Sequence, residues 1–128
     1  MHKNLSTRNP MITLNSMQSA IYFDLEMNCP DRGRRHVDDS EIIEIGIVEL
    51  NVASLEIMRE ANYLARPHRA ISQRCTRITG LVDDDFKGAA TLTNIIGRIR
   101  AEWPGNATGI AWGNDGDILT RACRQRRI

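Results

Sequence analysis

Short runs of apolar residues, separated by polar stretches that contain glycine or proline, fill the first half of this sequence. Short runs rich in Ile, Val, Tyr and Phe are typical of β-strands. Ile42 and Val48 interrupt the apolar–polar alternation of the second run, which indicates a strand covered on both faces. The pattern predicts a polar loop at 27–40, a hairpin turn at 51–54, and strands at 20–25, 41–51 and 55–65.

The second half of the chain follows the helical period instead. Residues 72–79 read as a short helix, with Ser72 as its N-cap and Gly80 at its end. A single apolar stripe with helical spacing predicts a longer helix over residues 91–103, and its members are Leu92, Ile95, Ile96, Ile99 and Trp103.

A short strand at 108–112 follows the long predicted helix, and a last helix begins at Asp115 or Asp117 and runs into Arg124. The predicted order is therefore β-β-β-α-β-α. Consecutive strands favour an antiparallel meander, whereas a strand that arrives after a helix is expected to lie parallel to the first strand. These expectations define an α/β fold with a mixed sheet flanked by helices.

The composition is that of one globular domain, with 128 residues of which 41% are hydrophobic and 26% charged. The net charge of +1 does not point to a nucleic-acid or membrane partner, and no apolar run is long enough to span a membrane. Residues 1–19 lack a continuous apolar stretch and are predicted to form a flexible leader. Reduced thiols in a cytoplasmic protein are expected from the wide spacing of Cys29, Cys75 and Cys123.

Two acids end the first predicted strand, in the stretch IYFDLEMNC. Asp24 and Glu26 are two residues apart, so their side chains point to the same face of a strand. Carboxylates this close repel each other unless a cation lies between them, and Mg²⁺ and Mn²⁺ prefer carboxylate oxygen. The pair therefore either holds such an ion or simply marks the point where the strand meets solvent.

A third acid follows the last predicted strand, in the stretch AWGNDGDIL. If that strand lies beside the first, Asp115 or Asp117 comes close to Asp24 and Glu26. Three carboxylates at one place are typical of a two-metal site, in which ions about 3.5–4 Å apart act on the attacking and leaving oxygens of a phosphoryl transfer.

Four segments in this order, FDLE, EIIEIGIVEL, CTRITGL and AWGNDGDIL, resemble the DnaQ-like 3′–5′ exonucleases of the DEDDh class, which have an RNase H-like fold. The pair Trp112-Gly113 is most similar to the Eri-1-like exoribonuclease branch, and the resemblance covers residues 21–123. It implies hydrolysis of phosphodiester bonds from the 3′ end of single-stranded RNA or DNA. The products would be nucleoside 5′-monophosphates, and the cofactors two Mg²⁺ or Mn²⁺ ions.

The resemblance also implies roles for individual acids. Asp24, Glu26 and Asp115 match the catalytic, metal-binding acids of the family, with Asp117 as the alternative to Asp115. Asp115 is favoured because it lies four residues before Leu119, as the family spacing requires. Glu44 also matches a frequent family position, where a structural role is expected.

Four further residues match positions that contact the substrate in the family. Met27 and Asn28 follow the acids, where the family contacts the terminal nucleotide with backbone and an apolar side chain. Leu81, in the ITGL segment, resembles a residue that packs near that nucleotide. A plain core position is the alternative for Met27 and Leu81. Trp112 either stacks on a base or packs in the core.

The third motif of the family, a histidine followed by an aspartate five residues later, does not occur in this sequence. In the family that histidine is the general base, whose loss typically costs about 10²–10⁴ in rate. Residues 20–128 are therefore expected to form a C-terminally incomplete exonuclease domain, weak or inactive, whose open sheet side favours self-association. A non-catalytic module that binds nucleic acid or protein is the alternative interpretation.

Overall fold

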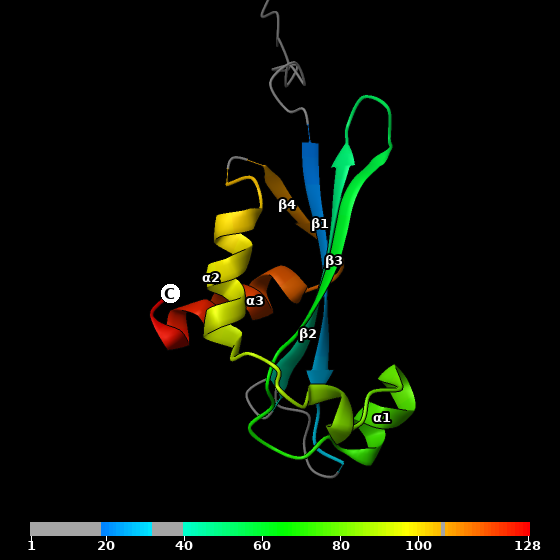
Figure 1. Ribbon diagram of the computed structural model, residues 1–128, viewed down its shortest axis with the longest axis vertical. Coiled ribbons are helices and arrows are strands. Elements are labelled where there is room, and N and C mark those ends of the chain that lie inside the picture. Colours follow the sequence, from blue (N-terminus) through cyan, green and yellow to red (C-terminus); the bar gives the residue numbers. More distant parts are fainter. Residues whose placement is uncertain (1–18, 32–39, 106) are drawn as a thin grey trace, which may run out of the picture.

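The fold is built on one mixed β-sheet. The computed structural model describes residues 19–31, 40–105 and 107–128 of the chain. β1 pairs antiparallel with β2 and parallel with β4, and β2 pairs antiparallel with β3, which confirms the predicted meander and the parallel fourth strand. The sheet order is β3-β2-β1-β4 (Figure 1), and the strands are β1 (Ser19–Asn28), β2 (Glu41–Asn51), β3 (Ile57–Leu64) and β4 (Thr108–Ala111).

The helices begin and end at local signals in the sequence. The hydroxyl groups of Ser72 and Thr91 accept hydrogen bonds from the first turns of α1 and α2, so both residues are N-caps. Gly80 ends α1 in the left-handed region, at φ 78°, which glycine adopts without steric cost. The three α-helices confirm the predicted ones, and the helical segments are α1 (Gln73–Thr79), the 3₁₀-helix η3 (Asp83–Phe86), α2 (Leu92–Glu102) and α3 (Asp115–Arg126).

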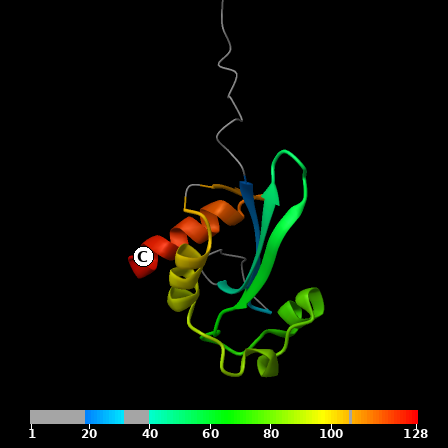
Figure 2. The same ribbon diagram turned by 45° about the horizontal axis from the view of Figure 1, so that its top comes forward.

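The helices form two separate layers. α2 and α3 cover one face of the sheet, and α1 and η3 lie beyond the other face near one end (Figure 1, Figure 2). The main core lies between the sheet and the α2–α3 layer, and its fully buried members include Ile45 and Ile95. A smaller cluster of Ile43, Cys75 and Phe86 joins the sheet to α1 and η3. We call the part of that second face that α1 leaves uncovered the open face.

A bulge in β2 explains why its apolar alternation fails. Glu26 pairs with Glu44, but the next residue, Met27, pairs with Ile42, so Ile43 is an extra residue in β2. An extra residue reverses the faces to which the following side chains point. Ile42 therefore packs in the main core and Ile43 in the smaller cluster, so β2 is covered on both faces at this end, whereas Val48 lies beside the groove of the open face.

Three predicted boundaries were wrong. β1 extends to Asn28, so Met27 and Asn28, which were predicted to begin the polar loop, belong to the strand. Ser19 belongs to β1 rather than to the predicted leader, whose other residues, 1–18, lie outside the described residues. β3 begins only at Ile57, because the side chain of Asn51 accepts two backbone N–H groups and holds a longer turn.

A polar cluster fixes the end of α2 on β3. The buried Trp103 donates from Nε1 to the Tyr63 hydroxyl at 2.9 Å, and this hydroxyl donates to Glu102 Oε2 at 3.0 Å. The Arg59 guanidinium lies 3.9 Å from the centre of the Trp103 ring and pairs with Glu49. Each buried polar atom of the cluster thus has a partner, as a stable packing requires.

No helix in the described parts of the chain is both long and apolar enough to cross a membrane. Cys29, Cys75 and Cys123 are all free thiols, of which Cys75 is buried.

Candidate active site

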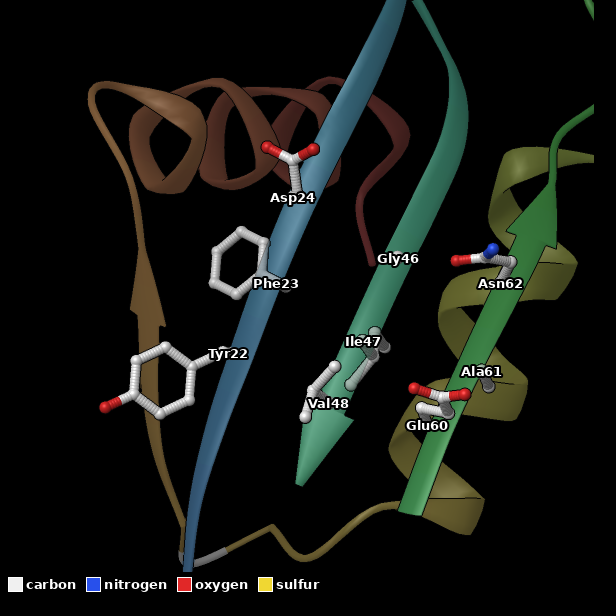
Figure 3. Close-up of a pocket in the computed structure, with 9 residues that line it drawn as sticks. All are labelled: Tyr22, Phe23, Asp24, Gly46, Ile47, Val48, Glu60, Ala61 and Asn62. Carbon is white, nitrogen blue, oxygen red and sulfur yellow. The ribbon is translucent and has the colours of Figure 1, made fainter. Parts of the chain in front are cut away.

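Asp24 and Glu26 lie on the side of the sheet away from α2 and α3. Figure 3 shows Asp24 on the near side of β1, with both helices behind the sheet. The spacing of two residues keeps Glu26 on the same face, because the register shift comes only after Glu26. Asp24 is exposed at the open face, and Glu26 is half-buried.

Asp115 reaches β1 from the first residue of α3. β4 pairs with β1 only as far as Phe23 opposite Ala111, so the backbone N–H of Leu25 lies beyond the end of β4. The Asp115 carboxylate occupies that place, where its Oδ2 accepts a hydrogen bond from Leu25 N at 3.1 Å. Asp117 is exposed on the same helical turn, and residues two apart on a helix do not share a face. Of the two candidates, the structure therefore brings Asp115 between the acids of β1.

Mutual repulsion and burial mark these carboxylates as one electrostatic group. Burial raises the pKa of Asp24, and the carboxylate of Asp115 raises it further. Burial likewise raises the pKa of Glu26, followed by the charges of Asp24, Glu44 and Asp115. Glu44, which pairs with Glu26 across β1 and β2, has its pKa raised by burial and then by Asp24. Glu44, for which a structural role is expected, therefore lies beside the acids of β1.

The donor set fits a hard divalent cation. Clustered carboxylate oxygens are the ligands that Mg²⁺ and Mn²⁺ prefer, and a cation would offset the repulsion that raises these pKa values. Within residues 19–31, 40–105 and 107–128, no three Asp, Glu, His or Cys side chains are arranged so that they could hold a metal ion, so the acids would have to draw closer together to bind one. The side chains that would hold the ions are those of Asp24, Glu26 and Asp115.

Trp112 stands at the turn between β4 and α3. Its side chain is 91% exposed, so the alternative that it packs in the core was wrong. Gly113 has φ 62°, a left-handed conformation that lets the chain turn directly from the strand toward Asp115. The indole is therefore presented to solvent next to the residue that enters the acid group.

The other residues matched to substrate contacts are partly or fully buried. Met27 packs against the main core, and Leu81 packs against the smaller cluster beside α1. Asn28 is only 3% exposed, and its side-chain amide binds other protein groups. Along β1, Met27 and Asn28 directly follow Glu26, whereas Leu81 comes from the connection between α1 and η3.

A groove of about 560 Å³ crosses the open face beside Asp24 (Figure 3). Asp24, Gly46 and Asn62 form one row across three strands, and the absence of a side chain at Gly46 leaves the middle of the row open. A Cβ atom at Gly46 would lie 3.1 Å from Asn62 Oδ1. The sequence analysis missed this row, because only the register of the β2–β3 hairpin places Asn62 there.

A scan against protein-family models matched residues 21–105 to the RNase T family, which is described as exonuclease. The chain belongs to this exonuclease family. The predicted relationship to DEDDh exonucleases is thereby confirmed. A search of the curated proteins found no match.

Solved structures show that the exonuclease domain has the fold of this class. The nuclease domain of 3′hExo, a DEDDh family member bound to rAMP, has a TM-score of 0.71 at 24% identity, over 89% of this chain and 62% of that one. Cell-death related nuclease 4 has a TM-score of 0.72 at 16% identity, over 88% of this chain and 41% of that one. Exonuclease I of E. coli, in complex with a dT13 oligonucleotide, has a TM-score of 0.65 at 13% identity, over 86% and 24%. The chain thus spans less than two thirds of each of these proteins.

Proposed function

We propose that this exonuclease domain is a metal-dependent 3′–5′ exonuclease that releases nucleoside 5′-monophosphates from single-stranded RNA. The observation that carries the proposal is the position of Asp115, whose carboxylate binds Leu25 N between Asp24 and Glu26. These three acids would hold two Mg²⁺ or Mn²⁺ ions. When bound, such ions supply charge stabilisation for both the attacking and the leaving oxygen.

The preference for a 3′ end of RNA has two supports. Among the similar structures, the 3′hExo nuclease domain is bound to rAMP. A second similar structure is that of a 3′-exonuclease with 3′-end specific recognition of a histone mRNA stem-loop. In this chain, the exposed Trp112 offers a flat surface three residues before Asp115, and stacking on an aromatic ring contributes about 1–3 kcal/mol per base. Leu81, which packs on the same side of the sheet as the acids, would complete the apolar side of the nucleotide site.

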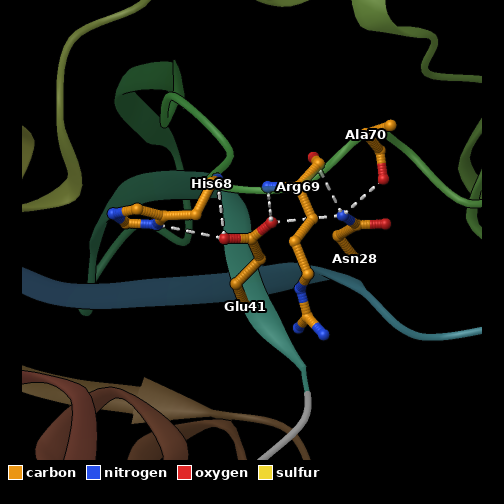
Figure 4. A network of polar contacts seen from close by, with 5 residues as sticks. All are labelled: Asn28, Glu41, His68, Arg69 and Ala70. Carbon is orange, nitrogen blue, oxygen red and sulfur yellow. Dashed lines mark hydrogen bonds and ion pairs between the residues drawn. The ribbon is translucent and has the colours of Figure 1, made fainter.

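Binding without cleavage is the second candidate function. Among the residues that the structure describes, His68 is the one histidine, and its Nδ1 lies 3.2 Å from Glu41 Oε2 (Figure 4). It is thus engaged near Asn28, and not with the acid group. Because a positioned general base contributes about 10²–10⁴ in rate, we expect cleavage by this chain to be weak.

A labelled oligonucleotide separates the two functions. The purified chain is incubated with a single-stranded RNA labelled at its 5′ end, with Mn²⁺ and at high enzyme concentration. Shortening of the RNA one nucleotide at a time, absent in Asp24→Ala, supports the exonuclease. Retention of intact RNA in a mobility shift supports the binding module, and the absence of both refutes the proposal.

Two further properties belong to the same proposal. The open face exposes apolar side chains, which favours self-association of the chain. The three free thiols agree with a reducing compartment, and we place the protein in the cytoplasm.

A further inference from the structure

The side-chain amide of Asn28 is buried and engaged at both ends. Its Nδ2 donates to Glu41 Oε1 and to the Ala70 carbonyl, both at 3.2 Å (Figure 4), and its Oδ1 accepts from Ser72 N at 3.0 Å. A reversed amide would turn Oδ1 toward a carboxylate and a carbonyl, so only this orientation satisfies the groups around it. The amide therefore binds the segment before α1, and not a substrate.

Glu41 supports the same segment from the adjacent strand. It is the register partner of Asn28, and its carboxylate accepts hydrogen bonds from His68 N at 2.9 Å and Arg69 N at 3.1 Å (Figure 4). Burial alone would raise the pKa of Glu41, but the hydrogen bonds from His68, Asn28 and Arg69 lower it. Glu41 is thus a charged anchor, and its Oε1 also fixes the Asn28 amide.

Side chains, and not a neighbouring strand, take up most of the backbone N–H groups from residue 68 to residue 75. Asp83 accepts from Ile71 N at 2.8 Å, and Asp31 accepts from the first two residues of α1, at 3.2 and 2.7 Å. Because a segment without ladder bonds takes its position from such contacts, its acceptors decide where α1 begins. Asn28 is the most buried of these acceptors and the one that lies on β1 directly after the acids.

The position of α1 also determines the position of Leu81. Cys75 of α1 packs in one cluster with Ile43, the extra residue of the β2 bulge beside Glu44. The next residue of the helix, Thr76, donates from Oγ1 to the Leu81 carbonyl at 2.8 Å. A displaced α1 would therefore move Leu81 relative to the sheet that carries the acids.

We infer that Asn28 is a positioning residue of the candidate active site, which sets the place of α1 and Leu81 relative to Asp24 and Glu26. The inference rests on the proposed function, because it concerns the wall of the same nucleotide site. The inference also separates metal binding from nucleotide binding. The acids would hold the metal ions, whereas Asn28 would affect only the binding of the nucleotide, through the position of Leu81.

The test compares nucleotide binding with metal binding. Asn28→Asp keeps the size of the side chain, removes both N–H donors, and places a second carboxylate next to Glu41 Oε1. Adenosine 5′-monophosphate is titrated in the presence of Mn²⁺, and its affinity is expected to fall about tenfold, whereas the affinity for Mn²⁺ alone stays within about twofold. Hydrogen exchange of the backbone amides at 73–80 is expected to accelerate about tenfold, with no change in the middle of β1.

Two variants control this experiment. Asn94→Asp makes the same change at an exposed position of α2 and is expected to leave every readout unchanged. Glu41→Gln added to Asn28→Asp returns an amide N–H to the pair, and is expected to recover part of the nucleotide affinity. If Asn28→Asp does not fold, Glu41→Gln alone is the milder variant, with a smaller loss in the same direction.

The outcomes separate the inference from the proposed function. A wild-type chain that binds Mn²⁺ but no nucleotide would overturn both. Equal nucleotide binding by wild type and Asn28→Asp would overturn the inference alone. A parallel loss of Mn²⁺ and nucleotide binding in the folded variant would also overturn it, because that result indicates a general structural role.

Discussion

Asp115 and Asp117 illustrate how a single hydrogen bond decides between two residues of the same type. Both follow Trp112 within one helical turn, so the sequence spacing leaves both open. The end of β4 leaves the Leu25 N–H without a strand partner, and only the first residue of α3 accepts it. The acid that completes this edge of the sheet is therefore also the one that lies next to Asp24.

Neutralising Asp115 is expected to weaken the metal site. Asp115→Asn keeps the size of the side chain but removes a charged ligand, and loss of even an outer ligand typically lowers metal affinity by about 10- to 100-fold. Mn²⁺ affinity, measured by titration calorimetry, should fall at least about tenfold. Asp117→Asn is the matched control and should bind Mn²⁺ as wild type does; the reverse order would mean that Asp117 is the ligand.

Glu44→Gln is expected to stabilise the metal-free protein at neutral pH. Like charges directly opposite on a sheet repel, and relief of the Glu26–Glu44 pair should raise the free energy of unfolding by about 0.5 kcal/mol. Because folding raises the pKa of Glu44 above its ordinary value of 4.5, the wild type loses stability as the pH rises above that value. Thermal melts should therefore show a gain at pH 7 that disappears near pH 4. A gain of the same size at both pH values would exclude this cause.

At the scale of the elements, the polar cluster at the end of α2 links a helix to an edge strand. Trp103 and Tyr63 are both buried, and the Tyr63 hydroxyl is the acceptor of the indole N–H. Arg59 covers the indole ring from the side of β3. The contact thus holds the helical layer in place over the main core.

Tyr63→Phe is expected to lower the free energy of unfolding by about 1–3 kcal/mol, because it leaves the buried Trp103 N–H without an acceptor. Urea denaturation gives this value. Tyr22→Phe removes a hydroxyl from a side chain that is 42% exposed, and should change stability by less than about 0.5 kcal/mol. Equal effects of the two substitutions would show that the cluster does not hold α2.

The sequence was informative where structure is set by neighbours along the chain. Ser72, Gly80 and the apolar stripe of α2 act within a few residues, and the helices that they predicted are confirmed. The end of β1 and the bulge at Ile43 could not be predicted, because both depend on how β1 and β2 align. For the same reason the sequence located Asp24 and Glu26 but not Asn62, whose place beside them depends on the β2–β3 register.

At the scale of the whole molecule, the two faces of the sheet differ. One is covered by α2 and α3, whereas the open face exposes Tyr22 and Ile110, which pair side by side on β1 and β4. Val48 lies on the other side of Tyr22. Apolar side chains grouped on an exposed face favour contact with another surface, so these side chains are expected to meet one.

Self-association through the open face predicts a specific effect of charge. Ile110→Lys places a cation among the apolar side chains and should weaken association by about tenfold or more, since a buried unpaired charge is costly. Ile78→Lys is the matched control, because Ile78 is 70% exposed on α1, which covers another part of the sheet. Sedimentation over a range of protein concentrations measures both. If both variants associate alike, the open face is not the contact.

The bulge at Ile43 has a practical consequence for hybrid proteins. Ile42 and Ile45 of β2 both point into the main core although they are three residues apart, and the extra residue makes this possible. A graft that exchanged β2 for the strand of a relative without the inserted residue would turn Glu41 and Ile42 to the wrong faces. Any exchange of segments in this domain should therefore transfer β1 and β2 together, as one cassette.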